Sequence, residues 1–88
     1  MYKERKIVEK IAKYEIVYYR SKHGKRVIGK VHKVNRVNSK VEALAIGDQV
    51  VSRSNTLDTV DVYKGYLRRA TPKMIELVFE VHLNPNMY

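Results

Sequence analysis

The chain has 88 residues, with 18 Lys and Arg against nine Asp and Glu, and it contains no cysteine. A chain of this length predicts a single domain over residues 1–88 with one modest hydrophobic core, and the lack of cysteine excludes disulfides, thiolate metal sites and a cysteine nucleophile. No apolar run approaches the roughly 18 residues of a membrane span, and no signal-peptide core follows the basic start, so we expect a cytoplasmic protein that does not contact membranes.

The positive charge is concentrated in the first half of the chain. Residues 1–40 hold 13 basic and three acidic side chains, a net charge of +10, whereas residues 41–88 hold five basic and six acidic ones, a net charge of −1. A surface polarised in this way attracts phosphate backbones through Coulomb forces and the release of counterions. The alternative interpretation is that these cations only keep the protein soluble.

The first elements predicted along the chain are a helix and a β-hairpin. Apolar residues at offsets of three and four predict a helix over residues 3–13, although one parity of the same segment also fits a strand. Residues 15–20 are rich in β-branched and aromatic types and predict a strand. We expect a tight turn at His23-Gly24 and a returning strand over residues 26–31.

The middle of the chain predicts more strands. Gly29, inside the returning strand, indicates a β-bulge or a close approach of two backbones. Valines between residues 31 and 41 recur with helical spacing, but Val and Asn are poor helix formers. We therefore predict that the strand continues to Val37 and that Asn38-Ser39 forms a turn. The remaining elements here are strands over residues 40–46 and 49–53, with a turn at Gly47-Asp48 between them.

The second half predicts a helix and a long strand. N-cap residue types at 54–56 precede an apolar face with helical spacing, which ends near Arg68 and Arg69, where a helix end favours cations. Thr71-Pro72 is expected to stop this helix. Residues 73–83 alternate between two faces and predict a half-buried strand. The predicted fold class is a small two-layer α+β domain, with a mostly antiparallel sheet of four to five strands, an N-terminal helix, and a second helix before the C-terminal strand.

The strongest candidate site is the predicted hairpin. Cations crowd its turn and two tyrosines precede them: Arg20, Lys22, Lys25 and Arg26, together with His23, after Tyr18 and Tyr19. Lys and Arg contact phosphates, a two-stranded ribbon fits the major groove of DNA, and Tyr rings stack on unpaired bases. The structural alternative is that an exposed tip is simply charged, and that one of two adjacent tyrosines lies in the core.

A second candidate is a basic stripe that would extend the phosphate track from the hairpin. It consists of Lys30, Lys33, Arg36 and Lys40, which nearly align on a helix but fall on both sides of a regular strand. Of these, Lys30, Lys33 and Arg36 are expected to extend the track. A solvated surface explains the same residues without any function.

Catalysis is not expected. The three histidines, His23, His32 and His82, have no metal-ligand spacing, and no Gly-rich loop that would cradle a phosphate is present. The acidic side chains are explained by the start of a helix and by the polar face of a strand. We predict no catalytic residue, no metal site and no cofactor.

The sequence therefore predicts a small non-catalytic protein that binds DNA or RNA, single- or double-stranded, through the phosphate backbone. The alternative is a small inhibitor or adaptor, of viral or plasmid origin, whose basic face docks on an acidic protein. Seven tyrosines in so short a chain fit this alternative, because Tyr is enriched at protein interfaces. An uncovered edge strand would also permit a homodimer through sheet extension.

Overall fold

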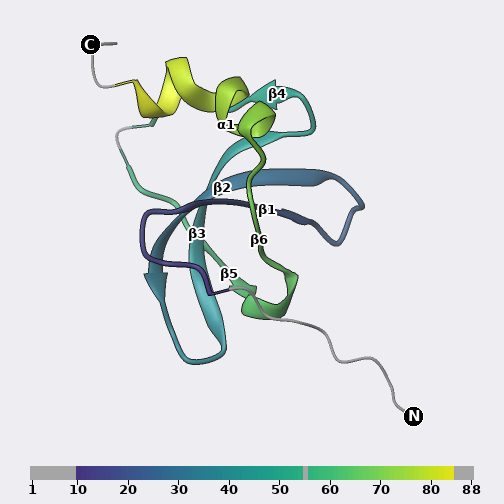
Figure 1. The fold of residues 1–88 in the computed structure, drawn as a ribbon, viewed down its shortest axis with the longest axis vertical. Coiled ribbons are helices and arrows are strands. Elements are labelled where there is room, and N and C mark those ends of the chain that lie inside the picture. The colour runs from purple at the N-terminus through teal and green to yellow at the C-terminus, as the bar shows by residue number, and fades with distance from the viewer. Residues whose placement is uncertain (1–9, 55, 85–88) are drawn as a thin grey trace.

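A curled antiparallel sheet dominates the structure, which is a computed structural model describing residues 10–54 and 56–84 (Figure 1). Its strands are β1 (Ile16–Arg20), β2 (Arg26–Val34), β3 (Asn38–Ile46), β4 (Gln49–Val50), β5 (Val60–Tyr63) and β6 (Arg68–Arg69). A 3-10 turn, η1 (Lys64–Tyr66), joins β5 to β6. The single α-helix of the described residues, α1 (Pro72–Val78), continues into a π-helical turn, η2 (Phe79–Leu83).

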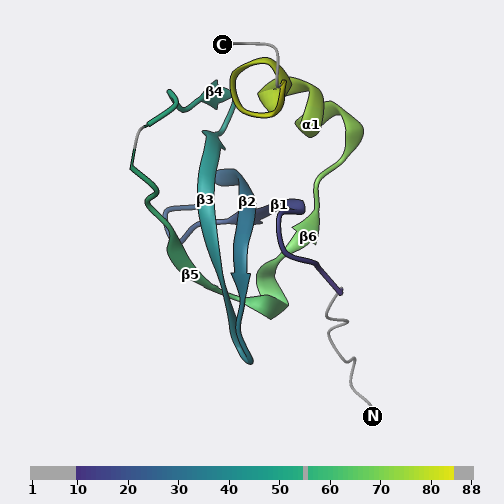
Figure 2. The same cartoon turned by 90° about the vertical axis from the view of Figure 1, so that its left-hand side faces the viewer.

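The strand order brings the two ends of the sheet toward each other. β1, β2 and β3 form a meander, β6 pairs with the outer edge of β1, and both β4 and β5 pair with the outer edge of β3. Figure 2 shows β5 and β6 on either side of β2 and β3, linked through η1. The sheet therefore curls around an interior, and α1 covers one end of it.

Two hydrophobic clusters, one on each face of the sheet, hold the fold together. The first consists of Val17, Val31, Val41, Val62 and Leu67, and the second of Ile28, Leu44, Ala45 and Val78. Strand β1 contacts both, because Tyr19 packs on the first cluster and Tyr18 on the second. Alternate side chains of a strand point to opposite faces, so β1 is covered on both sides.

The predicted irregularity at Gly29 is confirmed. The pairing of β2 with β3 shifts register between Ile28 and Gly29, which is a β-bulge. A Cβ atom at Gly29 would lie 2.4 Å from Val41 Cγ1 and 2.8 Å from the carbonyl oxygen of Glu42. Gly29 is therefore needed because the backbone of β3 approaches it too closely for any side chain.

The predicted strands of the first hairpin are confirmed, and the mostly antiparallel sheet is as expected, but the N-terminal helix is wrong. Residues 10–12 have no regular secondary structure and residues 13–14 form a turn, while residues 3–9 of the predicted helix lie outside the described residues. Tyr14 takes a left-handed backbone conformation (φ +72°), which ends any continuing helix, and its N–H donates to the carbonyl oxygen of Val31. The apolar spacing instead places Ile11 against the first core cluster.

Both elements predicted for the second half of the chain are wrong, because the structure has strands where a helix was expected and a helix where a strand was expected. The expected helix before residue 70 is β5, η1 and β6, and the expected C-terminal strand is α1 and η2. Thr71-Pro72 begins a helix rather than stopping one, since Thr71 is the N-cap whose Oγ1 accepts a hydrogen bond from the Met74 N–H and Pro72 occupies the first turn. The same residues that alternate in the sequence also place Met74, Leu77 and Val78 on one helical face, which packs on the second cluster.

The turn between β2 and β3 lies three residues earlier than predicted. Residues 35–37 connect the strands, and Asn38 and Ser39 already belong to β3. The turn at Gly47-Asp48 is confirmed, whereas the strand predicted after it is reduced to β4. Among the described residues, no helix is long and apolar enough to cross a membrane.

The segment before β1 is attached to the neighbouring edge strand, β6, through Arg69. Arg69 Nε donates to Glu15 Oε2 at 2.6 Å, and Arg69 also donates to the carbonyl oxygen of Lys10. Glu15 Oε1 accepts from the Ala12 N–H at 2.9 Å. The pKa of Glu15 is lowered, first by the hydrogen bond from Ala12. Burial opposes this by raising the pKa, and the hydrogen bond and charge of Arg69 add smaller effects that lower it.

Replacing Gly29 by alanine should destabilise the fold more than the same replacement at Gly47, where glycine is favoured only by its positive φ. We expect Gly29→Ala to reduce the free energy of unfolding by about 3 kcal/mol, because the new methyl group meets backbone that cannot move aside. Gly47→Ala is the control: Gly47 has φ +62° and open space around it, so only the backbone cost of about 1 kcal/mol applies. Urea unfolding measures both, and equal losses would contradict the close approach at Gly29.

Removing the charge of Glu15 should make stability less dependent on pH. A carboxyl whose pKa is lowered by folding stabilises the fold fully above its unfolded pKa, near 4.5, and loses that contribution as the pH falls through the folded pKa. Glu15→Gln keeps an oxygen that accepts from Ala12 but loses the charge. We expect the variant to be less stable than the parent at neutral pH, and the difference to shrink below about pH 4.5 and to vanish once Glu15 is protonated in the folded protein. Parallel stability curves for the two proteins would show that the Glu15–Arg69 pair does not contribute.

Candidate functional site

The β1–β2 hairpin is a tight, internally bonded turn. The Ser21 N–H donates to the carbonyl oxygen of Lys25 at 2.8 Å, and the Gly24 N–H donates to that of Ser21 at 2.9 Å. Ser21 Oγ also accepts from the His23 N–H at 3.3 Å. Gly24 alone takes the positive φ in this turn (+82°), so His23 does not need the left-handed conformation that the sequence allowed.

Three of the predicted cations lie exposed on this hairpin. Arg20 Nη1 donates to the carbonyl oxygen of Gly24 at 2.6 Å, which uses one of its five N–H donors and fixes the guanidinium. Lys22 and Lys25 are exposed at the tip, and within residues 10–54 and 56–84 their ammonium groups have no hydrogen bond or ion pair. The hairpin therefore presents three charges on a rigid support.

The fourth predicted cation, Arg26, has internal partners instead. Its Nη2 donates to the carbonyl oxygen of Gly47 at 2.6 Å and to Asp48 Oδ1 at 3.1 Å. The Gly47 N–H donates in return to the carbonyl oxygen of Arg26 at 2.8 Å. Arg26 thus connects the start of β2 to the turn between β3 and β4 and is not part of the candidate site.

The two predicted tyrosines are half-buried. Tyr18 packs on the second core cluster and Tyr19 on the first, so neither ring is a freely exposed platform. Burial raises the pKa of the Tyr19 phenol, because an ionised oxygen would lose its hydration there. Adjacent residues of a strand point to opposite faces, so each core cluster partly covers one of the two rings.

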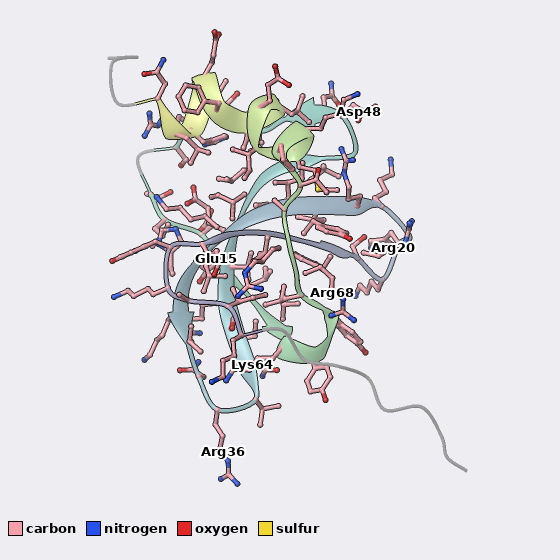
Figure 3. All side chains as sticks on the ribbon, viewed as in Figure 1. Glu15, Arg20, Arg36, Asp48, Lys64 and Arg68 are labelled. Atoms are coloured by element: carbon pink, nitrogen blue, oxygen red, sulfur yellow. The ribbon has the colours of Figure 1, made fainter. Side chains whose placement is uncertain are left out.

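The structure does not bring the second basic stripe to the hairpin. His32 is an extra residue in β2, since the pairing with β3 shifts between Val31 and Lys33, and this bulge puts Lys30 and Lys33 on one face of the strand. Arg36 lies at the tip of the β2–β3 turn, and Figure 3 shows it at a different end of the molecule from Arg20. Lys30 lies over the ring of Tyr14, with its Nζ 5.6 Å from the ring centroid.

Tyr66 and Arg68, which were not among the predicted site residues, lie beside the hairpin. Because β6 pairs with β1, Arg68 is opposite Tyr18, and Figure 3 shows Arg20 and Arg68 on the same side of the molecule. A shallow hollow of about 440 Å³ separates η1 from the hairpin, and we call it the Tyr66 hollow. It is lined by Tyr18, Tyr19, Arg20, Ser21, Gly65, Tyr66 and Arg68. The helix end that was expected to explain Arg68 does not exist, so that explanation is wrong.

The η1 turn holds Tyr66 in a defined position. Tyr66 is 59% exposed and stacks edge-on with Tyr63, with ring centroids 5.3 Å apart and planes at 78°. Gly65 allows this pairing, because a Cβ there would lie 2.4 Å from Cε2 of Tyr63. Arg68 Nη1 donates to the carbonyl oxygens of Gly65 at 3.1 Å and Leu67 at 2.9 Å, which fixes its guanidinium against the turn.

Four acidic side chains contact basic side chains elsewhere. Arg26–Asp48, Lys40–Asp61 and Arg69–Glu15 are the Lys and Arg ion pairs among the described residues, and His32 Nε2 contacts Glu42 Oε1. None of them involves Arg20, Lys22, Lys25 or Arg68, so the positive charge around the Tyr66 hollow is not balanced by a carboxylate in contact. Within the same part of the chain, no group of three or more His, Asp or Glu side chains is placed to hold a metal ion.

Two other hollows among the described residues lack this combination of cations and an exposed aromatic ring. One lies along α1 and η2 and is lined by Glu76 and Glu80, whose charge repels phosphates. The other is lined by Lys10 and Lys64, and no aromatic ring lines it. Of these three hollows, the Tyr66 hollow is the one that combines fixed cations with an exposed aromatic ring.

Comparison with known proteins gives no assignment. No protein-family model, no curated protein and no solved structure matches this chain.

Proposed function

We propose that this protein binds nucleic acid without catalysis, and that the tip of the β1–β2 hairpin and the η1–β6 corner form its binding surface. The observation that carries the proposal is the meeting of Arg20 and Arg68, 48 positions apart in the sequence, around one hollow with no carboxylate paired to either. Lys22 and Lys25 extend the same charge to the hairpin tip.

Phosphate groups are the ligands that this arrangement suits best. Arg and Lys side chains are common phosphate contacts in nucleic-acid-binding proteins. The affinity of such proteins depends on releasing counterions from the nucleic-acid backbone. Arg20 and Arg68 each keep free N–H donors after their internal hydrogen bonds, because a guanidinium has five. Side chains that are already held in place lose less conformational entropy on binding.

The proposed binding surface differs from the site predicted from the sequence. It keeps Arg20, Lys22 and Lys25 and adds Arg68. It leaves out Arg26, whose hydrogen bonds stabilise the fold. Lys33 and Arg36 lie on the other side of the bulge at His32 and provide an independent comparison within the same protein.

Two double variants test the location of the surface. Lys22→Ala/Lys25→Ala and Lys33→Ala/Arg36→Ala each remove two exposed positive charges, one pair from each hairpin. We expect the first variant to bind short DNA or RNA more weakly and to reduce the slope of log K against log salt by up to about 1.4 on single strands or 1.8 on duplex DNA. The second should reduce affinity less and keep the slope nearly unchanged. Fluorescence anisotropy over a salt series measures both.

The outcomes separate the proposal from its alternatives. Equal losses in the two double variants would show that binding follows net charge rather than the hairpin. If the parent protein bound neither DNA nor RNA at low salt, the nucleic-acid function would be wrong, and an acidic protein partner would become the better interpretation.

Sheet extension to a homodimer also stays a prediction, for which β5 offers the longest outer edge among the described strands.

A further inference from the structure

We infer that the Tyr66 hollow receives an unpaired base, so that the protein prefers single-stranded over double-stranded nucleic acid. This inference rests on the proposed function and names the form of nucleic acid that the same surface would take. Tyr66 presents 59% of its surface to solvent, and its ring is in edge-on contact with Tyr63.

The position of the Tyr66 ring is supported by its neighbours in β5 and η1. Its edge-on contact with Tyr63 supports the ring from one side, and Gly65 provides the space that the Tyr63 ring occupies. An aromatic side chain fixed in this way binds a base with little further loss of rotamer freedom. Aromatic stacking is also tolerant of sequence, because every base has a π-face.

Two planar cations line the same hollow as the ring. The two hydrogen bonds from Arg68 Nη1 to the η1–β6 backbone hold its guanidinium, and the hydrogen bond to the carbonyl oxygen of Gly24 holds that of Arg20. Guanidinium groups stack on bases and donate to phosphates. The hollow therefore combines a stacking surface with donors for the adjoining phosphates.

The size of the hollow also suits a single base. The hollow measures about 440 Å³, which suits a group of small-ligand size and is too small for a duplex about 20 Å across. In a duplex the faces of the bases are stacked on their neighbours and cannot reach Tyr66, whereas an unpaired base offers a free face. Duplex DNA would then contact the hairpin charges without using the hollow.

The chain offers a matched control for the aromatic contact. Tyr14 is 56% exposed, close to the value for Tyr66, and two lysines lie over its ring. It precedes β1, whereas Arg20 ends that strand, so Tyr14 lies at the opposite end of β1 from the hollow. Tyr14→Ala therefore removes an equally exposed ring from a different place.

The experiment compares a single-stranded oligothymidylate, the same chain with abasic residues in place of thymidines, and a duplex of equal length, at constant low salt. For the parent we expect the intact single strand to bind more tightly than the other two. Tyr66→Ala should lower affinity for the intact strand by roughly 5- to 150-fold, the range for loss of one stacked base, and leave the abasic chain and the duplex unchanged. Tyr66→Phe keeps the aromatic ring and should bind the intact strand with the affinity of the parent. Tyr14→Ala should also have the affinity of the parent. Urea unfolding confirms that the variants are folded.

The results distinguish this inference from the proposed function. If the parent bound intact and abasic chains equally, or if Tyr66→Ala and Tyr14→Ala had the same effect, the base-binding hollow would be wrong, while binding through hairpin charges would stand. If no nucleic acid of any kind bound, the proposed function would fail and the hollow with it.

Discussion

The connection between β5 and β6 is the constraint on which the shape of the protein depends. These strands pair with opposite outer edges of the β1–β2–β3 meander, and only residues 64–67 join them. In a flat sheet they would be about 19 Å apart, four strand spacings, whereas a 3-10 path of this length spans roughly 10 Å. The sheet must therefore curl, and the curl encloses the first core cluster and leaves one end for α1 to cover.

The same connection creates the candidate site. Because η1 delivers the chain to the outer edge of β1, Arg68 comes to lie opposite Tyr18, and Tyr66 comes to lie beside the β1–β2 hairpin. Leu67 anchors this corner, since it is fully buried in the first cluster while its neighbours on both sides contribute to the hollow. Stability and the candidate function thus depend on one short turn.

Local signals in the sequence predicted the parts of the fold that local interactions decide. The hairpin around Gly24 and the bulge at Gly29 followed from residue types whose backbone preferences are strong. Residues 57–83 were misread because their apolar spacing fits both a helix and a strand, and packing chose between them. Val62 pairs with Ser39 in β3, far away in sequence, and Leu77 packs on the second cluster; neither contact is visible in a local pattern.

By itself, the sequence determined the charge asymmetry, the basic hairpin and the strands that form it, because composition and turn chemistry act over a few residues. Only the tertiary structure decided which charges are available and which rings are exposed. Arg26 is neutralised by Asp48, 22 positions away, while Arg20 gains Arg68 as a neighbour. Tyr18 and Tyr19 are covered by core residues, and Tyr66 is left open. Ion pairing and burial join residues that are distant in the chain, so they follow from the curl of the sheet rather than from any local pattern.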